Sequence, residues 1–442
     1  MKFTARPGSN QAQQGIHGTI RVPGDKSISH RSIMLGAIAE GTTEVNGFLE
    51  GEDALATLAA FRDMGVDIDG PDNGRVTVRG VGLHGLQAPA APLDLGNSGT
   101  SIRLLTGLLA GQYFASELIG DESLSKRPMG RVADPVKQMG ARVATDEGGC
   151  PPVRISAAEK PLTAIDYVLP MASAQVKSCV LLAGLYAEGT TSTVEPAPTR
   201  DHTERMLRGF GYDVQVDGSK ASLSGGGKLT ACNIDVPADI SSAAFFLVAA
   251  SITPGSDLVL EHVGINPTRT GVIDILQLMG ADIEISNERE VGGEPVANLR
   301  VRAATLKGID IPASLVPLAI DEFPALFIAA ACAEGATTLT GAEELRVKES
   351  DRIQAMVDGL QLLGVDAKGT PDGAVIVGQP ELGAGNDVAI DCRHDHRIAM
   401  SFALAALRSN IIITVDDCDN VATSFPNFVE LAQSVGMNLT SE

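Results

Sequence analysis

One stretch of the sequence combines carboxylates and cations in a pattern suited to proton transfer beside an anion. Residues 343–352 read Glu-Glu-Leu-Arg-Val-Lys-Glu-Ser-Asp-Arg. If this stretch is helical, Lys348, Glu349 and Arg352 fall within an arc of ~100° on one helical face. A structural ladder of ion pairs has the same appearance, but a carboxylate between two cations is also what acid–base chemistry on an anionic substrate requires. Asp321, at the start of another expected helix, supplies a second carboxylate.

Groups that bind anions recur at the expected starts of other helices. The N-terminus of a helix attracts phosphate and carboxylate groups through its free N–H groups and its dipole. Lys26 and Ser27 stand at such a start, and Arg31 follows Ser27 one turn later on the same face. Taken alone, each such segment is equally an ordinary helix cap, and His30 fits a structural role at least as well as a catalytic one. The other starts are the glycine-rich segment 96–103, the segment 170–175 with its hydroxyl and amide, and the basic segment 391–397.

Further cations follow two of these helix starts. Residues 126–131 read Lys-Arg-Pro-Met-Gly-Arg, which predicts either an anion-binding segment or a solvated basic patch. Arg200 adds a cation in the third repeat and is followed by Asp201 and His202. This Asp-His pair has no third ligand at a suitable spacing, so we expect no metal site.

The helix starts belong to a unit that is repeated six times along the chain. Each copy reads as an apolar helix, a β-branched strand, a second helix and a glycine that precedes a further strand. A period of about 70 residues or more is too long for a solenoid and fits a βα unit with its own small sheet. We therefore expect an α/β (α+β) fold in which three copies form each of two similar domains. The closing glycines lie about 70 to 84 residues apart, at Gly65, Gly140, Gly211, Gly280, Gly364 and Gly436.

The domain boundaries follow from the grouping of the six copies. A chain of 442 residues is long enough for two cores. One domain is expected to comprise residues 24–237, with copies one to three. The other is expected to comprise residues 1–23 plus 238–442, with copies four to six. The strand-like segment Gly18–Val22 precedes the first copy and is expected to pair with the latter domain.

Composition restricts the classes of partner and the compartment. A net charge of −21 makes nucleic acid and anionic membranes poor partners for the surface as a whole. The six cysteines are scattered without a paired spacing, which indicates reduced thiols. Residues 1–14 are polar and lack the apolar segment of a secretory signal. We therefore expect a cytoplasmic enzyme that acts on small anionic molecules.

Taken together, the motifs resemble those of the 5-enolpyruvylshikimate-3-phosphate synthase family. PGDKSISHR, GNSGTSIR, SKRPMGR, MASAQ, RVKESDR and HDHRIAM occur in that family's order and cover essentially the whole chain. The resemblance implies the enolpyruvyl transferase fold, an inverse α/β barrel with three βαβαββ repeats in each domain. It also implies that a monomer, without a metal or organic cofactor, transfers the enolpyruvyl (carboxyvinyl) group of phosphoenolpyruvate to the 5-hydroxyl of shikimate 3-phosphate. Phosphate is released by addition and elimination through a tetrahedral intermediate, in the shikimate pathway to chorismate and the aromatic amino acids.

The resemblance assigns roles to residues that match the family's motifs. Asp321 is expected to take the hydroxyl proton, Glu349 to act at the phosphoenolpyruvate methylene, and Lys26 to complete the catalytic set. The residues expected to contact shikimate 3-phosphate are Lys26, Ser27, Arg31, Ser173, Ala174, Gln175, Arg200, Asp321 and Lys348. The residues expected to contact phosphoenolpyruvate are Lys26, Gly99, Arg127, Gln175, Arg352 and Arg397.

Two positions depart from the family pattern. Ala174 stands where serine is common and offers only its backbone N–H. Thr423 stands where many members have a lysine, which leaves that phosphate contact in doubt. Both changes resemble one divergent bacterial branch of the family.

Two alternative functions remain at the level of the sequence. The sister enzyme that transfers enolpyruvyl to UDP-N-acetylglucosamine has the same fold, but its mobile loop carries a reactive cysteine. The corresponding residues 120–134 contain no cysteine. A non-catalytic, anion-binding repeat protein is the other alternative, and it has no obvious need for Asp321 and Glu349 among cations.

Overall fold

The structure is a computed structural model that describes residues 1–7, 15–383 and 385–442. The chain forms two compact units. Unit 1 contains residues 1–23, 237–289 and 295–442, and unit 2 contains residues 24–236 and 290–294. The expected boundaries differ at two places, because Pro237 lies in unit 1 and the short segment 290–294 lies in unit 2. Residues 8–14 of the expected first segment lie outside the described residues.

Unit 2 contains six α-helices among its described residues: α1 (Lys26–Ala37), α2 (Glu52–Asp63), α3 (Gly99–Leu109), α4 (Gly130–Gln138), α5 (Ala174–Gly184) and α6 (His202–Gly209). Its 3₁₀ helices are η1 (Leu124–Lys126) and η2 (Glu147–Gly149). Its strands are β3 (Glu40–Asn46), β4 (Asp67–Asp72), β5 (Arg75–Val81), β6 (Leu93–Asp94), β7 (Ser116–Ile119), β8 (Val143–Ala144), β9 (Val153–Ile155), β10 (Leu162–Thr163), β11 (Asp166–Val168), β12 (Ala187–Glu188), β13 (Thr190–Val194), β14 (Val214–Asp217), β15 (Lys220–Ser224) and β16 (Asn233–Asp235).

Unit 1 has the same kind of inventory. Its α-helices are α7 (Ile240–Ile252), α8 (Gly271–Leu278), α9 (Phe323–Ala331), α10 (Arg352–Leu362), α11 (His396–Ala405) and α12 (Phe428–Ser434). Its 3₁₀ helices are η3 (Ala313–Leu315), η4 (Glu343–Val347), η5 (Ala406–Arg408) and η6 (Cys418–Thr423). Its strands are β1 (Phe3–Ala5), β2 (His17–Ile20), β17 (Asp257–Gly264), β18 (Asp282–Val291), β19 (Glu294–Arg302), β20 (Ala336–Leu339), β21 (Asp366–Thr370), β22 (Gly373–Val377), β23 (Val388–Asp391), β24 (Ile413–Asp416) and β25 (Leu439–Ser441). The end of β18, the turn after it and the first residue of β19 belong to unit 2.

One sheet order recurs through both units and confirms the repeat. The orders are β16-β3-β5-β4, β6-β7-β9-β8 and β11-β13-β15-β14 in unit 2, and β2-β17-β19-β18, β20-β22-β21 and β23-β24-β1-β25 in unit 1. In the four-stranded sheets the first strand is parallel to the second, and the second is antiparallel to the third. In the three-stranded sheet, a parallel bridge between Asp310 and Thr338 takes the place of the first strand. None of these orders closes into a barrel.

Three of the sheets are completed by strands from distant parts of the chain. Strand β16, at the end of the long segment of unit 2, pairs with β3 of the first copy through Ile234 and Val45. Strand β2 pairs with β17 of the fourth copy, as predicted for the segment Gly18–Val22. Strand β1 lies between β24 and β25 of the last copy, with Phe3 opposite Val415. One such strand therefore completes a sheet of unit 2, and two such strands complete sheets of unit 1.

The six closing glycines end the second helix of each copy in the same way. All six have a positive φ, between 77° and 103°. After α2, the N–H of Gly65 bonds to the carbonyl of Arg62, and the N–H of Val66 bonds to the carbonyl of Phe61. This pair of bonds is the Schellman motif, which requires a left-handed residue that glycine adopts without steric cost. The corresponding bonds recur after α4, α6, α8, α10 and α12.

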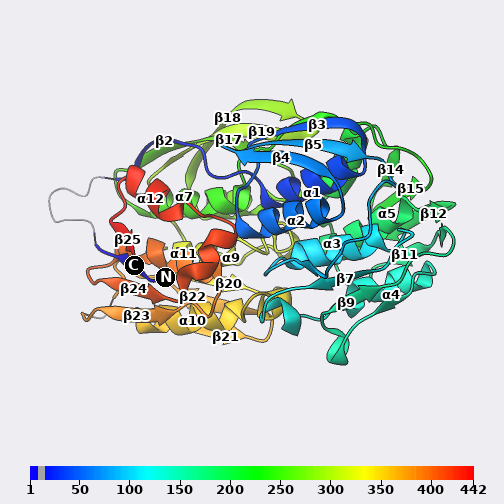
Figure 1. Cartoon of the computed structure of the whole chain (residues 1–442). Helices are drawn as coiled ribbons and strands as arrows, with labels where there is room; N and C mark the ends of the chain where they lie inside the picture. The colour runs from blue at the N-terminus through cyan, green and yellow to red at the C-terminus, as the bar shows by residue number, and fades with distance from the viewer. Residues whose placement is uncertain (8–14, 384) are drawn as a thin grey trace. The chain divides into compact units, whose positions relative to one another are not determined.

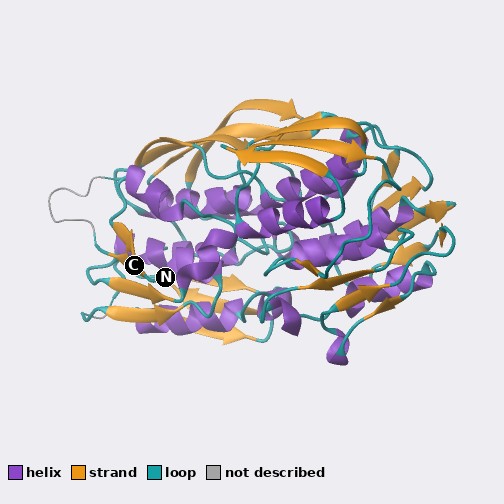
Figure 2. Ribbon diagram, in the orientation of Figure 1, coloured by secondary structure: helices purple, strands orange, loops and turns teal. Residues whose placement is uncertain are grey.

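The first helix of each copy forms the core of its unit. All residues of α7 and α9 are buried, and most residues of α1, α3, α5 and α11 are buried as well. In Figures 1 and 2, α1 and α2 cover one face of the sheet that contains β3, β4 and β5, and α7 lies against the sheet of β17 and β19. Such burial explains why these helices are apolar all round rather than amphipathic. In these first helices, the polar groups that can bind a ligand lie in the N-terminal turns. Within the described residues, no helix combines the length and apolar character needed to cross a membrane.

Candidate active site

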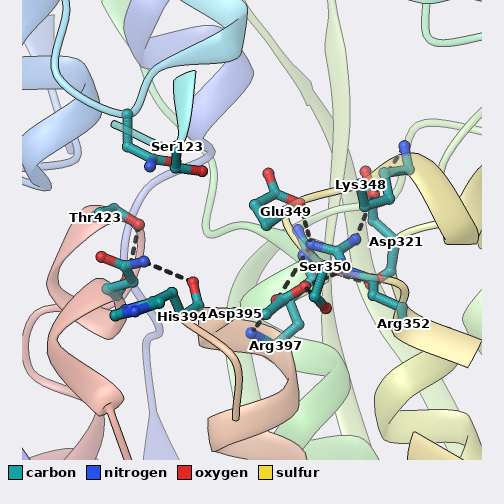
Figure 3. Close-up of polar contacts among 12 residues, drawn as sticks. Ser123, Asp321, Lys348, Glu349, Ser350, Arg352, His394, Asp395, Arg397 and Thr423 are labelled. Atoms are coloured by element: carbon teal, nitrogen blue, oxygen red, sulfur yellow. Dashed lines mark hydrogen bonds and ion pairs between the residues drawn. The ribbon is translucent and has the colours of Figure 1, made fainter. Parts of the chain in front are cut away.

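A guanidinium surrounded by three carboxylates forms the centre of the polar site in unit 1 (Figure 3). Arg352 is the first residue of α10 and is only 2% exposed. Its Nε atom lies 2.8 Å from Oδ2 of Asp395, and its Nη2 atom lies 2.6 Å from Oε2 of Glu349. Its Nη1 atom lies 3.1 Å from Oδ1 of Asp321. Lys348 approaches the same Asp321 oxygen at 3.4 Å.

The prediction of one helix over residues 343–352 is wrong, because the helix is interrupted in the middle. The 3₁₀ helix η4 ends at Val347, Lys348 has extended backbone, and α10 begins only at Arg352. Asp351 fixes this start, because its side chain accepts a hydrogen bond from the N–H of Gln354. Lys348 and Arg352 nevertheless meet at Asp321, because a cap and a short loop bring them together rather than a shared helical face.

Asp395 is the carboxylate that holds this group in place. It is fully buried at the N-cap of α11, where one oxygen accepts from the N–H of Arg397 at 3.0 Å and the other accepts from the hydroxyl of Ser350 at 3.0 Å. Burial, the largest single influence, would raise the pKa of the Asp395 carboxyl, but the charge and hydrogen bond of Arg352 together with His396 hold that pKa below its ordinary value. Burial would likewise lower the pKa of Arg352, but Asp395, Glu349 and Asp321 together raise it. The pair is therefore ionised on both sides.

The cation of the last copy joins the same group. Nη1 of Arg397 donates to the backbone carbonyl of Asp321 at 2.7 Å and lies 3.6 Å from Oε1 of Glu322. Glu322 also accepts from the hydroxyl of Ser241 at the start of α7. The helix starts of the fourth, fifth and sixth copies are thus joined through polar side chains within unit 1.

The substituted position Thr423 contributes to the same region in a different way. Its hydroxyl donates to the carbonyl of Asn420 at 2.7 Å, and its side chain is buried. The amide of Asn420 in turn donates to the carbonyl of His394 at 2.6 Å. Thr423 therefore supports the loop that leads into α11, and its hydroxyl proton is used within the protein.

In unit 2, Arg31 is buried beneath the starts of three helices. Its Nη1 atom donates to the carbonyl of Ser27 at 2.9 Å, and its Nε atom donates to the hydroxyl of Thr203 on α6 at 2.7 Å. Its Nη2 atom donates to the hydroxyl of Ser178 on α5 at 2.9 Å. Burial lowers the pKa of Arg31 to about 10, an effect that Glu204 opposes. Arg31 is thus a cation fixed at the junction of α1, α5 and α6.

Lys26 begins α1 and pairs with a carboxylate from the next helix. Its Nζ atom lies 2.8 Å from Oδ2 of Asp53 in the first turn of α2. Asp25 caps α1 by accepting from the N–H of Ile28 at 2.9 Å. The cap and the ion pair fix the ammonium at the N-terminal end of α1, where an anion would also be favoured.

The glycine-rich helix start lies beside a cluster of polar side chains. A Cβ atom placed on Gly99 would lie 3.0 Å from Nη1 of Arg127 and 3.4 Å from Nη1 of Arg103. Arg103 donates to Oε1 of Gln175 at 2.5 Å, and Gln175 donates to the hydroxyl of Thr100 at 3.1 Å. The structure therefore gathers Gly99, Arg127 and Gln175 in one place, and glycine leaves room for the two guanidinium groups.

The third helix start presents its backbone N–H groups together with a hydroxyl. Ser173 is the N-cap of α5 and accepts from the N–H of Val176, and Ala174 and Gln175 form the first turn. Arg200 lies just before α6 and is close enough to Arg31 to contribute to the lowering of the Arg31 pKa. Two cations held near one another in this way are typical of a site that binds an anion.

Sequence reasoning did not single out Asp395, Asp53 or Arg103 as site residues, although each contacts one that was. Asp395 had a usable signal, because an aspartate at an N-cap followed by a cation matches the pattern of the other starts. Asp53 and Arg103 had none, since their contacts join residues far apart in the chain. Among the described residues, no cluster of three His, Cys, Asp or Glu side chains is arranged to hold a metal ion.

Comparisons with known proteins agree with this arrangement of motifs. Residues 10–431 match the family model described as EPSP synthase (3-phosphoshikimate 1-carboxyvinyltransferase). The chain is 67% identical to the 3-phosphoshikimate 1-carboxyvinyltransferase of Methylococcus capsulatus, over 99% of this chain and 98% of the relative. It is 66% identical to the same-named protein of Alkalilimnicola ehrlichii, over 100% of this chain and 97% of the relative.

Solved structures extend the comparison to the fold. EPSP synthase from Acinetobacter baumannii is 61% identical and superposes with a TM-score of 0.89, with 100% of both chains covered. The enolpyruvyl transferase NikO from Streptomyces tendae is 17% identical, with a TM-score of 0.79 over 99% of this chain and 98% of that one, and so shares the fold. The family model spans most of the chain, and the two relatives cover 99% and 100% of it. The chain therefore belongs to the EPSP synthase (3-phosphoshikimate 1-carboxyvinyltransferase) family.

Proposed function

We propose that this chain transfers the carboxyvinyl group of phosphoenolpyruvate to the 5-hydroxyl of shikimate 3-phosphate and releases phosphate. The observation that carries the proposal is the group around Arg352, in which Asp321 and Glu349 lie beside a buried guanidinium. A non-catalytic anion-binding protein has no use for two carboxylates at such a point. The family relationship gives this group its substrates.

Shikimate 3-phosphate is assigned to the cations and helix starts of unit 2, together with Asp321 and Lys348. Its phosphate is proposed to bind at the N-terminus of α5, through Ser173, the N–H of Ala174 and Gln175, with Arg200 as the neighbouring cation. Lys26, Ser27 and Arg31 complete the contacts from α1. The phosphate would use the free N–H groups of α5 and the positive end of its dipole.

Phosphoenolpyruvate is assigned to the guanidinium groups and to the glycine that makes room for them. Gly99, Arg127 and Gln175 lie together in unit 2, whereas Arg352 and Arg397 lie together in unit 1. Planar guanidinium groups suit carboxylate and phosphate because they donate two parallel hydrogen bonds. Lys26 would stabilise the phosphate as it leaves, since an ammonium near a departing anion lowers the barrier electrostatically.

The two carboxylates divide the proton transfers. In the addition, Asp321 takes the proton of the 5-hydroxyl while the oxygen of that hydroxyl bonds to C2 of phosphoenolpyruvate. Glu349 gives a proton to the methylene carbon, and a tetrahedral intermediate forms. In the elimination, Glu349 takes a proton back from the methyl group and the bond from C2 to the phosphate oxygen breaks. The departing phosphate receives the proton that Asp321 took from the 5-hydroxyl. Neighbouring cations can separate the pKa values of two such carboxyls, which suits one to act as base and the other as acid.

The test of the proposal is the dependence of phosphate release on each substrate. Purified protein should release phosphate from phosphoenolpyruvate only when shikimate 3-phosphate is present. Release with UDP-N-acetylglucosamine in its place would favour the sister activity, and release with neither acceptor would contradict both transfers. Binding of both substrates without any turnover would support the non-catalytic alternative.

We also propose that the protein acts as a monomer in the cytoplasm. The scattered cysteines, all six of which are unpaired in the structure, are consistent with a reducing compartment. Light scattering coupled to gel filtration should give a mass near 45.8 kDa, and twice that mass would contradict the monomer. Fractionation of the source cells tests the compartment.

A further inference from the structure

A buried lysine in unit 2 joins two carboxylates behind the proposed phosphate site. Lys177 lies on α5, one turn after Ser173, and its side chain is 3% exposed. Its Nζ atom lies 2.8 Å from Oε1 of Glu204 on α6, which is also 3% exposed, and 3.1 Å from Oε2 of Glu195. These three residues form the Lys177 cluster, and none of them is among the residues assigned above to substrate.

Burying the three charged side chains of the Lys177 cluster in a core has a high desolvation cost. Removing ions from water costs several kcal/mol each, and buried ion pairs can often be replaced by apolar side chains without loss of stability. Here two carboxylates share one ammonium, and Oε2 of Glu204 accepts no hydrogen bond from the described residues. A contribution to stability therefore explains the buried cluster poorly. A role in positioning the groups that the cluster binds explains it better.

One side of the cluster holds the residue that precedes Arg200. The two carboxylate oxygens of Glu195 accept from the N–H of Thr199 at 3.3 Å and from its hydroxyl at 2.5 Å. The Nζ atom of Lys177 donates to the carbonyl of Thr199 at 3.4 Å. All three polar groups of Thr199 are thus bound by the cluster, which fixes the backbone from which Arg200 extends.

The other side of the cluster reaches Arg31. Glu204 and Thr203 are neighbours in the first turn of α6, and the hydroxyl of Thr203 accepts from Nε of Arg31 and donates to Ser178. Glu204 also favours the charge of Arg31, opposing the effect of burial on its pKa. Lys177, by pairing with Glu204, thus ties the start of α6 to α5 at the point where Arg31 is held.

We infer that Lys177 is a positioning residue for shikimate 3-phosphate: through Thr199 and α6 it places Arg200 and Arg31 around the phosphate. The inference rests on the proposed function. It predicts an effect on one substrate only, because the residues assigned to phosphoenolpyruvate in unit 2 are not among the contacts of the cluster.

The experiment compares Lys177→Met with wild type in steady-state kinetics and in calorimetric titration with shikimate 3-phosphate alone. We expect KM and Kd for shikimate 3-phosphate to rise about tenfold or more, the equivalent of about 1.4 kcal/mol, while kcat and the KM for phosphoenolpyruvate stay within about threefold. Lys228→Met, which removes an exposed lysine paired with Glu40, is the matched control and should behave as wild type. Unchanged affinity for shikimate 3-phosphate in folded Lys177→Met would overturn the inference.

Two further variants separate position from stability. Thr199→Val removes the hydroxyl bond to Glu195 without leaving a buried charge, and should raise the KM for shikimate 3-phosphate severalfold even if Lys177→Met does not fold. Lys177→Met combined with Glu204→Gln removes the excess buried charge, so it should regain thermal stability but not affinity. Normal affinity in either variant would contradict the inference. Failure of wild type to bind shikimate 3-phosphate would instead count against the proposed function.

Discussion

Arg352 and Asp395 form a buried ion pair in which Nε and Oδ2 are 2.8 Å apart and neither side chain is more than 2% exposed. The pair joins the first residue of α10 to the N-cap of α11, the two helices that carry Arg352 and Arg397, which are assigned to phosphoenolpyruvate. Because Asp395 also accepts from the N–H of Arg397, one carboxylate orients both arginines. We therefore expect Asp395 to contribute both to the stability of the protein and to substrate binding.

Replacing Asp395 by asparagine should destabilise unit 1. Breaking a buried pair leaves an uncompensated charge, which typically costs 3–5 kcal/mol, and we expect about 3 kcal/mol because Glu349 and Asp321 still face Arg352. Urea denaturation of Asp395→Asn against wild type measures the loss. Asp366→Asn, in an exposed pair with Lys368, is the control and should change the free energy of unfolding by under about 0.5 kcal/mol. A loss below about 1 kcal/mol in Asp395→Asn would show that the pair is not needed for folding.

Replacing Glu349 by glutamine should abolish most turnover while leaving binding intact. The amide keeps the size of the side chain but cannot carry the proton, so kcat should fall at least ~100-fold, the usual scale for loss of a general acid–base group. Rapid-quench measurement of turnover and calorimetric titration of both substrates separate the two effects. Glu343→Gln, an exposed glutamate in η4, is the matched control. A near-normal kcat in Glu349→Gln would show that Glu349 does not transfer a proton in the reaction.

The parts of the fold that the sequence predicted are those decided by local geometry. A left-handed glycine such as Gly65 and an N-cap such as Asp239 act within one helical turn, so a pattern of residue types identifies them. The six closing glycines and the helix starts of the repeats were found for this reason. The register of β1 beside Val415 was not predicted, because it joins residues more than 400 positions apart.

The site shows the same division between local and long-range causes. The residue types around Asp321 and Arg352 indicated acid–base chemistry, but the assumed helix through Lys348 was wrong because a cap at Asp351 intervenes. The role of Asp395 depends on the packing of α10 against α11, which no pattern within either helix encodes. The family motifs predicted which residues contact the substrates, whereas the contacts among those residues could be seen only in the structure.

Replacing Gly99 by alanine should weaken phosphoenolpyruvate binding specifically. The added Cβ would lie 3.0 Å from Nη1 of Arg127, so the guanidinium must shift. We expect the KM for phosphoenolpyruvate to rise about tenfold, the equivalent of about 1.4 kcal/mol, with the KM for shikimate 3-phosphate nearly unchanged. Gly130→Ala, at the first position of α4 with its nearest neighbour 3.9 Å away, is the matched control for steady-state kinetics. Equal KM values for phosphoenolpyruvate in both variants would mean that Arg127 adjusts without loss.

The buried imidazole of His30 should make the stability of unit 2 depend on pH. Its Nδ1 atom is hydrogen-bonded to the hydroxyl of Thr57 at 2.7 Å, whereas Nε2 is buried without a partner among the described residues. Burial, reinforced by Lys26 and Arg31, lowers the pKa of His30 well below its ordinary 6.5. The folded protein thus keeps His30 neutral at a pH where the unfolded chain binds a proton. The free energy of unfolding should therefore be unaffected by His30 above pH ~6.5 and fall below it, by up to about 1.4 kcal/mol per pH unit.

The variant His30→Asn tests this sign, because asparagine can keep the bond to Thr57 but does not titrate. Urea denaturation between pH 7 and pH 5 should show a shallower decline of stability in His30→Asn than in wild type, by up to about 1.4 kcal/mol per pH unit. His17→Asn changes an exposed histidine and is the control for a His-to-Asn change, measured over the same pH range. Wild type and His30→Asn share all their other ionisable groups, so the difference between their slopes isolates His30. Identical slopes for wild type and His30→Asn would mean that the imidazole is protonated in the folded state, which its unpartnered, buried Nε2 atom and its two cationic neighbours both oppose.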